Sequence, residues 1–364
     1  MRRHPVPGAA AMVRRLRLNR NWHRVRRQEK SGENQQLSGS SRLASRLLLT
    51  LFVLWTVATI LFLIFRLMPG SPYAAFVSPT FTPEQQESLR RAFGLDRSLF
   101  EQYLLFLGRL LQGDLGESFF YKRPVTEVVM SAFGNTIALT LTSLLIAYAF
   151  GVLVGAMLAW KRGTWVEGVG IPAVLVTRAA PEFWLGMVML AVFSFGFGWF
   201  PGGGANSVGQ TYSSEWARIL SADFLRNLIM PALALALYLQ GLPLLLMRTN
   251  MLEVMQEDFV TMARMKGLSS WAIVMRHAAR NALLPVATAF ALGIGQSVGG
   301  NVVVETVFSW PGLGRMLVEA VASSDYPLAQ GAFLLITAVL VTMNFVADLV
   351  YSLLDPRIAH ASHR

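Results

Sequence analysis

The chain has 364 residues, of which 54% are hydrophobic and 15% are charged. Soluble globular domains average about 25% charged residues, so this composition excludes an ordinary soluble protein of this size. The absence of cysteine excludes disulfides, thiolate metal sites and a cysteine nucleophile. The net charge of +11 lies almost entirely in residues 1–46, which hold 12 basic and 2 acidic residues.

Apolar segments long enough to cross a bilayer dominate the rest of the sequence. A helix needs about 20 apolar residues to cross a hydrocarbon core of about 30 Å, and lipid requires its backbone polar groups to be satisfied within the segment. Five uncharged segments are long enough, or nearly so, without extension: Leu47–Phe65, Gly134–Trp160, Asn227–Met247, Asn281–Val304 and Tyr326–Ala347. A sixth, Phe183–Phe200, is short unless it extends backward through Ile171–Ala180. We therefore predict an all-α polytopic membrane protein with six transmembrane helices.

The arginine-rich start predicts a cytoplasmic tail, largely disordered, that attaches to anionic membrane lipid. No nucleic-acid-binding motif accompanies its charge, so no nucleic acid is expected as a partner. The first apolar segment is too long, and begins too late, for a cleaved signal peptide. An organellar transit peptide and a start at Met12 are the alternatives for this region.

The distribution of Lys and Arg places both termini in the cytoplasm. With this orientation the inside segments carry 21 basic residues and the outside segments carry 10, of which 7 lie in one long loop where the rule has little force. The predicted parts are the tail (1–46), the first transmembrane helix (47–67), a large external loop (68–133), a core with five transmembrane helices (134–358) and a C-terminal tail (359–364). The external loop contains an apolar helical stretch near Phe100–Leu111.

The largest inner loop, 248–283, predicts two short helices on either side of Gly267–Ser270. Gly267 suits the C-terminal cap of the first helix, and Ser269 or Ser270 suits the N-terminal cap of the second. Such a pair either lies on the inner leaflet as amphipathic helices or protrudes into a groove on a partner protein.

Several stretches resemble the permeases of ABC importers, in particular the dipeptide/oligopeptide/nickel branch. Residues 257–268 (EDFVTMARMKGL) and 276–285 (RHAARNALLP) resemble the segment that couples such permeases to their ATPases, although the general Glu-Ala-Ala-three residues-Gly pattern is matched only at Ala263 and Gly267. Residues 301–314, 325–331 and 354–358 resemble the branch's last outer loop, final helix and terminus, while 68–72 and 181–186 match more loosely. The resemblance covers roughly residues 43–358, in order.

This resemblance implies the MetI-like fold of a type I importer permease in the plasma (inner) membrane of a bacterium or archaeon. Such a permease forms half of a translocation path with a second homologous permease subunit. Two ATP-binding subunits hold ATP and Mg, and an extracytoplasmic solute-binding protein delivers the solute, here expected to be a di- or oligopeptide, with nickel and sugars as alternatives. The residues implied in contact with the ATP-binding subunits are Glu257, Ala263, Arg264, Lys266, Gly267 and Leu268.

The residues independently argue against catalysis by this chain. A phosphate-binding loop needs Gly-Lys before Ser or Thr, and none of the four lysines follows a glycine. The five histidines show no metal-ligand spacing, and no Ser/His/Asp set is legible. We therefore expect no catalytic residue, no metal and no cofactor bound by this chain. The rival classes are an ATP-independent secondary transporter or channel, and a membrane scaffold.

Polar and small residues recur every four positions in the fifth span, and so share one helical face. Polar groups in a span usually face the bundle interior or a wet cavity. We therefore interpret this stripe as lining the translocation path, with the carboxylate near its outer mouth. Close helix packing through Gly295 and Gly299 is the alternative. The stripe consists of Gly293, Ser297, Asn301 and Glu305.

Two charged residues, Arg178 and Glu182, stand one helical turn apart around Pro181 in the extended sixth segment. A charge within a span costs roughly 2.5–3.5 kcal/mol on insertion scales. A mutual ion pair would offset part of this cost. We favour a local structural pair or a kink here over a site for a charged substrate.

Overall fold

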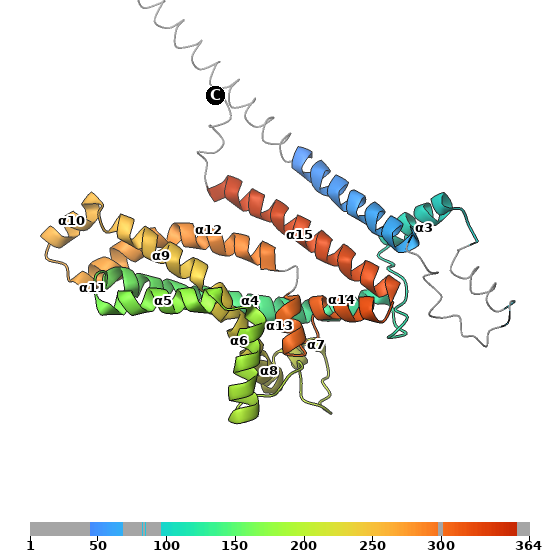
Figure 1. The fold of residues 1–364 in the computed structure, drawn as a ribbon. Coiled ribbons are helices and arrows are strands. Elements are labelled where there is room, and N and C mark those ends of the chain that lie inside the picture. The colour runs from blue at the N-terminus through green and yellow to red at the C-terminus, as the bar shows by residue number, and fades with distance from the viewer. Residues whose placement is uncertain (1–43, 68–81, 83, 85–95, 298–300, 355–364) are drawn as a thin grey trace, which may run out of the picture. The chain divides into compact units, whose positions relative to one another are not determined.

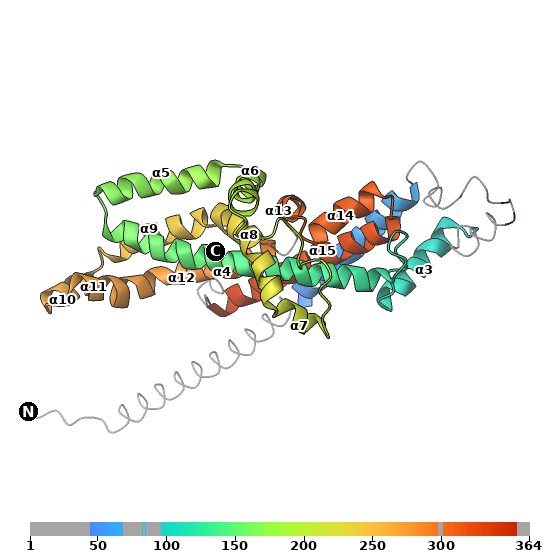
Figure 2. The ribbon, with the colours of Figure 1, turned by 90° about the horizontal axis from the view of Figure 1, so that it is seen from below.

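The computed structural model describes residues 44–67, 82, 84, 96–297 and 301–354, without the side chains of 295–297 and 347–354 (Figures 1 and 2). The chain divides into two units, Met1–Val53 and Leu54–Arg364. Most of the tail predicted at 1–46, the whole C-terminal tail predicted at 359–364 and much of the external loop lie outside the described residues.

The described residues are helical wherever they form regular elements, apart from one isolated bridge between Glu117 and Pro124. This confirms the predicted all-α class. After a first helix at Ala44–Leu67, the elements are α3 (Leu99–Leu111), α4 (Val125–Trp160), α5 (Trp165–Ala179), α6 (Glu182–Met189), the π-helix η1 (Leu190–Gly196), α7 (Glu215–Ile219), α8 (Ala222–Leu239), α9 (Gly241–Val254), α10 (Asp258–Met265), α11 (Ser270–Ala272), the π-helix η2 (Ile273–Ala278), α12 (Ala279–Ser297), α13 (Val302–Val307), α14 (Leu313–Ala322) and α15 (Tyr326–Leu354).

Within the described residues, four helices are long and apolar enough to cross a membrane: Ala44–Leu67, α4, α8 and the part of α15 up to Val346. The pair α5 with α6–η1 makes a fifth span if it is taken as one broken element, bent by 100°. Within the described residues the predicted count of six is therefore not fully confirmed. The remaining predicted span, Asn281–Val304, coincides in part with α12 (Ala279–Ser297), and its residues 298–300 lie outside the described residues.

Helix α4 begins nine residues earlier than the predicted span, so residues 125–133 belong to a helix and not to the external loop. Hydropathy misses this start because Thr126, Glu127 and Ser131 interrupt the apolar run. Val125 and Val129 are nevertheless buried, in a cluster that includes residues of α14 and α15. Packing against these two helices extends α4 beyond its apolar segment.

The predicted span Asn227–Met247 is interrupted at Gln240, between α8 and α9. Pro243 lacks the N–H that would otherwise bond to the carbonyl of Leu239. The predicted span Asn281–Val304 is also interrupted, since Asn301 has non-helical dihedrals (φ −105°, ψ 70°) before α13 begins.

Helix α4 is the centre of the packing and contacts α8, α9 and α12, while α9 and α12 also contact each other (Figure 2). Two glycines allow α9 to approach closely. A Cβ atom on Gly151 would lie 2.9 Å from Cγ of Pro243, and one on Gly155 would lie 2.5 Å from the carbonyl oxygen of Leu244. Small residues serve this purpose where two helices pack in a membrane.

Candidate coupling loop and outer cavity

The inner loop forms the two short helical pieces that its sequence predicts. Gly267 has φ +76° and ends α10, while the hydroxyl oxygen of Ser269 accepts a hydrogen bond from the backbone N–H of Ala272 (3.3 Å) at the start of α11. Both predicted caps are confirmed. In both views α10 and α11 lie beyond one end of α4, and α14 lies at the opposite end (Figures 1 and 2).

A small apolar cluster holds α10 against the following helix. Its members are Val260, Ala263 and Ile273, which are all buried. Ala263 is 6% exposed, so in this structure it packs the loop together from within. The other residues implied in partner contact are on the exposed surface of the loop: Glu257, Arg264, Lys266, Gly267 and Leu268.

The outer surface of α10 and its turn is apolar and uncovered. Met262 is 58% exposed and Met265 is 77% exposed, with Phe259 and Leu268 beside them. Contiguous exposed apolar side chains on a soluble surface mark interaction sites, and methionine adapts to irregular partner surfaces. Sequence reasoning selected Leu268 together with small and charged residues of this loop, but it did not select Phe259, Met262 or Met265.

Two contacts tie the loop to the ends of the long helices. On α9, the Arg248 guanidinium forms an ion pair with Glu167 of α5, with Nε 3.0 Å from Oε1. Glu167 also accepts a hydrogen bond from the backbone N–H of Gly163 (2.7 Å) in the α4–α5 turn. The rings of Trp160 and Trp271 lie 5.5 Å apart, which links the end of α4 to α11.

The stripe predicted from residue 293 to residue 305 does not lie on one helical face, because α12 ends before Asn301. Gly293 packs beside Tyr148 of α4, where a Cβ atom would lie 3.4 Å from the phenol oxygen. The side-chain amide of Asn301 donates to the hydroxyl of Thr140 on the same helix (3.2 Å). The side chain of Ser297 lies outside the described residues.

Glu305 has no exposed surface in this structure, so it does not line an open mouth here. Its carboxylate accepts hydrogen bonds from the hydroxyl of Thr136 (2.7 Å) and from the backbone N–H of Arg315 (3.0 Å). A Cβ atom on Gly312 would lie 2.3 Å from its carboxyl carbon. We call this arrangement of Glu305, Thr136, Gly312 and Arg315 the Glu305 junction. It joins α4, α13 and α14.

A second group of contacts beside this junction explains the Trp-Pro-Gly sequence at 310–312. The buried Trp310 indole donates to the carbonyl of Asn135 (3.0 Å), and the Asn135 amide donates to the carbonyl of Pro311 (2.9 Å). The backbone between α13 and α14 is therefore fixed to α4. Sequence reasoning had no signal for these partners, which lie about 170 residues away along the chain.

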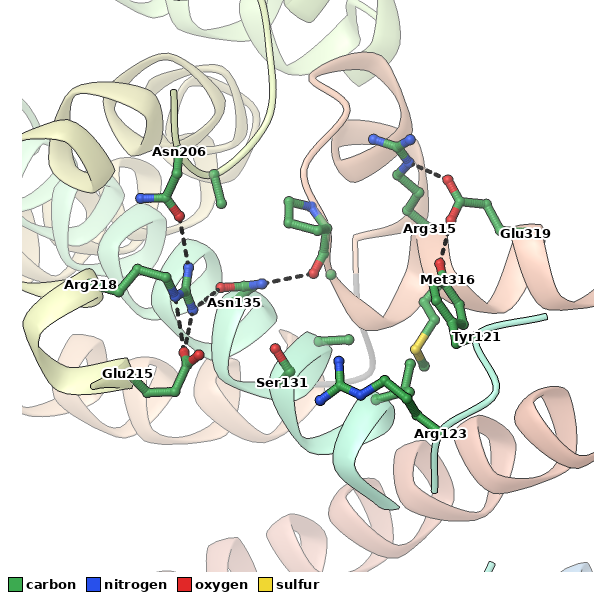
Figure 3. Close-up of a pocket in the computed structure, with 15 residues that line it drawn as sticks. Tyr121, Arg123, Ser131, Asn135, Asn206, Glu215, Arg218, Arg315, Met316 and Glu319 are labelled. Carbon is green, nitrogen blue, oxygen red and sulfur yellow. Dashed lines mark hydrogen bonds and ion pairs between the residues drawn. The ribbon is translucent and has the colours of Figure 1, made fainter. Parts of the chain in front are cut away.

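A cavity of about 550 Å³ opens beside these contacts. Figure 3 shows polar and charged side chains around it, from the segment before α4, from α4, from the loop before α7, from α7 and from α14. By the predicted orientation all of these segments lie on the outer side. The labelled lining residues are Tyr121, Arg123, Ser131, Asn135, Asn206, Glu215, Arg218, Arg315, Met316 and Glu319.

The charges around this outer cavity are ordered by short contacts. Arg218 is an ion-pair partner of Glu215 (2.8 Å) and donates to the amide oxygen of Asn135 (2.8 Å). On the opposite wall, Arg315 pairs with Glu319 (2.7 Å). Burial and the neighbouring Glu319 carboxylate raise the pKa of Tyr121. The cavity is thus lined by side chains of both charges and is suited to polar partners.

No group of three or more His, Asp or Glu side chains that could hold a metal ion occurs in the part of the chain that the structure describes. The fold and the loops define a multi-pass α-helical membrane protein with an exposed apolar helix pair at one end and a charged cavity at the other. Two family models match this chain: the binding-protein-dependent transport system inner membrane component, over residues 151–360, and its N-terminal part, over residues 41–140.

The chain therefore belongs to the family of binding-protein-dependent transport system inner membrane components. It is 36% identical to the di/tripeptide transport system permease protein DppB of Pseudomonas aeruginosa over 335 residues, which is 88% of this chain and 99% of that protein. It is 35% identical to the glutathione transport system permease protein GsiC of Salmonella typhimurium, over 86% of this chain and 97% of that protein.

Among solved structures, the MetNI methionine ABC transporter in its inward-facing form matches with a TM-score of 0.46 and 16% identity, over 65% of this chain and 97% of that chain.

Proposed function

We propose that the chain is the permease subunit of an ATP-driven ABC importer and that it forms half of the path for a solute delivered by an external binding protein. The observation that carries the proposal is the exposed apolar surface of α10 at Phe259, Met262, Met265 and Leu268. Arg264 and Lys266 flank this surface. A partner that covers these side chains would remove apolar surface from water, which favours association.

The structure offers a route by which movement of α10 reaches the membrane. Helix α10 packs on η2 through the Val260–Ala263–Ile273 cluster, and α11, η2 and α12 follow one another without a break from Ser270 to Ser297. A displacement of α10 would therefore also displace α12. The ion pair between Arg248 and Glu167 would pass the same displacement from α9 to α5. Closure of the ATPases would bias a two-state equilibrium between inward and outward access.

The proposed complex contains a second homologous permease subunit, two ATP-binding subunits that hold ATP and Mg, and the solute-binding protein. This chain supplies no catalytic group, and ATP hydrolysis belongs to the partner subunits. Both termini are proposed to lie in the cytoplasm of a bacterium or archaeon, with the chain in its plasma membrane. The outer cavity, with its ordered ion pairs, is the proposed contact for the solute-binding protein, because electrostatic complementarity steers such encounters.

Di- or oligopeptides are the proposed solutes, in line with the names of the two relatives. Nickel and sugars are the alternatives. We propose that Ser297 and Asn301, on either side of the interruption between α12 and α13, line the translocation path. Gly293 allows close contact of α12 with α4. Glu305 is assigned to the Glu305 junction, where it holds the outer end of this segment.

The test is co-expression of the chain with the ATPase and permease subunits that its host encodes, followed by purification through a tag on this chain. Met262→Glu places a charge on the proposed contact surface and should abolish recovery of the ATPase subunits. Val208→Glu is the matched control, because Val208 is fully exposed on the opposite loop and should leave recovery unchanged. Equal recovery in both variants would refute the proposed contact, and peptide uptake by the purified chain alone would refute an ATP-driven mechanism.

A further inference from the structure

The bend between α5 and α6 is flanked by two charged residues. Helix α5 and the α6–η1 helix meet at 100°, with the break at Ala180–Pro181 (Figure 1). Arg178 lies in the last turn of α5 and Glu182 opens α6. The kink that the sequence predicted is present, but no ion pair joins the two side chains. Their charges are therefore not neutralised by each other.

Neither side chain is hidden inside the subunit. Arg178 is exposed and Glu182 is partly exposed, and among the described hydrogen bonds and ion pairs none engages either charged group. Charged groups in a span avoid lipid and face a bundle interior or a water-filled cavity. Both groups therefore point to a polar space that this subunit shares with its surroundings in the complex.

A second interrupted helix meets the bend at the same place. Gly241, the first residue of α9, lies against the stem of Arg178, so that a Cβ atom there would be 2.9 Å from Cδ of the arginine. The preceding residue, Gln240, is 4% exposed and donates its side-chain amide to the hydroxyl of Thr177 (3.2 Å). Two helix interruptions in contact, lined by polar groups, are the arrangement with which membrane transporters build solute sites.

The chemistry at this place matches one kind of solute. A guanidinium binds a carboxylate with paired, charge-assisted hydrogen bonds, and a carboxylate accepts from an ammonium group. Arg178 and Glu182 are four positions apart in the chain, so their Cα atoms lie at most about 14 Å apart. An extended peptide of two or three residues spans about 7–10 Å. The long side chains of Arg178 and Glu182 can span the remaining distance to its two ends.

We propose that Arg178 and Glu182 form a subsite for the termini of a short zwitterionic peptide, with Arg178 at the peptide carboxylate and Glu182 at its α-ammonium. The inference rests on the proposed peptide import and adds the residues that recognise the solute inside the membrane. Thr177 and Gln240 act as positioning residues, because their hydrogen bond joins the two interruptions.

The test uses the full complex in proteoliposomes, with its binding protein and labelled Ala-Ala dipeptide. Arg178→Gln and Glu182→Gln should each lower uptake at least about tenfold, a loss equal to one charge-assisted contact. Assembly, and ATPase activity stimulated by loaded binding protein, should stay at the unmodified level. Arg97→Gln and Glu117→Gln, which change exposed side chains outside the spans, are matched controls and should leave uptake unchanged.

A cysteine at the bend gives a second readout that does not depend on transport. Because the chain has no cysteine, Ala180→Cys introduces a single thiol beside both charges. A charged thiol reagent should modify it, and saturating Ala-Ala should protect it. If the charge variants fail to assemble, this measurement still tests whether the peptide binds beside Arg178 and Glu182.

Unmodified uptake in both charge variants, or no protection of the thiol by peptide, would overturn the inference while leaving peptide import intact. A complex that imports nickel but no peptide would instead refute the proposed solute, and the inference with it.

Discussion

Replacing Glu305 by alanine should destabilise the chain far more than replacing an exposed glutamate. The Glu305 carboxylate has no exposed surface and accepts from the Thr136 hydroxyl at 2.7 Å and from the Arg315 N–H at 3.0 Å. Its loss leaves two donors without an acceptor, the buried Thr136 hydroxyl and the part-buried Arg315 N–H. Each unsatisfied donor costs about 1–3 kcal/mol, so the expected loss in the free energy of unfolding is about 2–6 kcal/mol.

The assay is thermal unfolding of the purified chain in detergent, followed by the loss of the monodisperse peak in gel filtration. One kcal/mol corresponds to roughly 2–4 °C for a domain of 150–250 residues, so the midpoint should fall by at least about 4 °C. Glu319→Ala is the control, since this carboxylate belongs to a partly exposed ion pair worth about 0–1 kcal/mol. Thr136→Val combined with Glu305→Ala should lose less than the sum of the single variants.

A midpoint for Glu305→Ala equal to that of Glu319→Ala would refute the structural role of the Glu305 junction. If stability were unchanged but uptake lost, Glu305 would belong to the path, as its place in the four-residue stripe first indicated.

Three further outcomes follow from the packing and the inner loop. Gly155→Val should separate α4 from α9 and lower the yield of folded chain, because even a Cβ atom there would lie 2.5 Å from a backbone oxygen; Gly108→Ala, with nothing within 4 Å, should leave the yield unchanged. Gly267→Val should weaken recovery of the ATPase subunits, because φ +76° strains a β-branched residue; equal recovery would contradict this. Arg248→Ala should raise the number of ATP molecules hydrolysed per solute imported, and an unchanged ratio would show that its ion pair does not transmit movement.

The sequence predicted the local features well because their causes are local. The caps at Gly267 and Ser269 follow from backbone conformation and from side-chain oxygens within three residues. The stretch Phe100–Leu111 was predicted helical, and α3 spans Leu99–Leu111 with a capping box between Ser98 and Glu101. Signals of this kind are complete within one or two helical turns.

The features that the sequence missed depend on partners far along the chain. Val125 and Val129 extend α4 because α14 and α15 bury them, and a hydropathy average over residues 125–133 contains no trace of that burial. Glu305 was interpreted by its helical spacing, whereas Thr136 and the backbone of α14 decide its surroundings. The sequence indicated a kink around Pro181, but it gave no sign that this kink contacts the interruption at Gln240.

The central claim is that α10 faces the cytoplasm and is held by an ATP-binding subunit. Met265→Cys puts a single thiol on the most exposed apolar position of α10, in a chain that has no other cysteine. In the assembled complex, a short bifunctional thiol-to-amine crosslinker should join this position to an ATP-binding subunit, and Val208→Cys should give no such product. A crosslink from Val208→Cys and none from Met265→Cys would contradict the account.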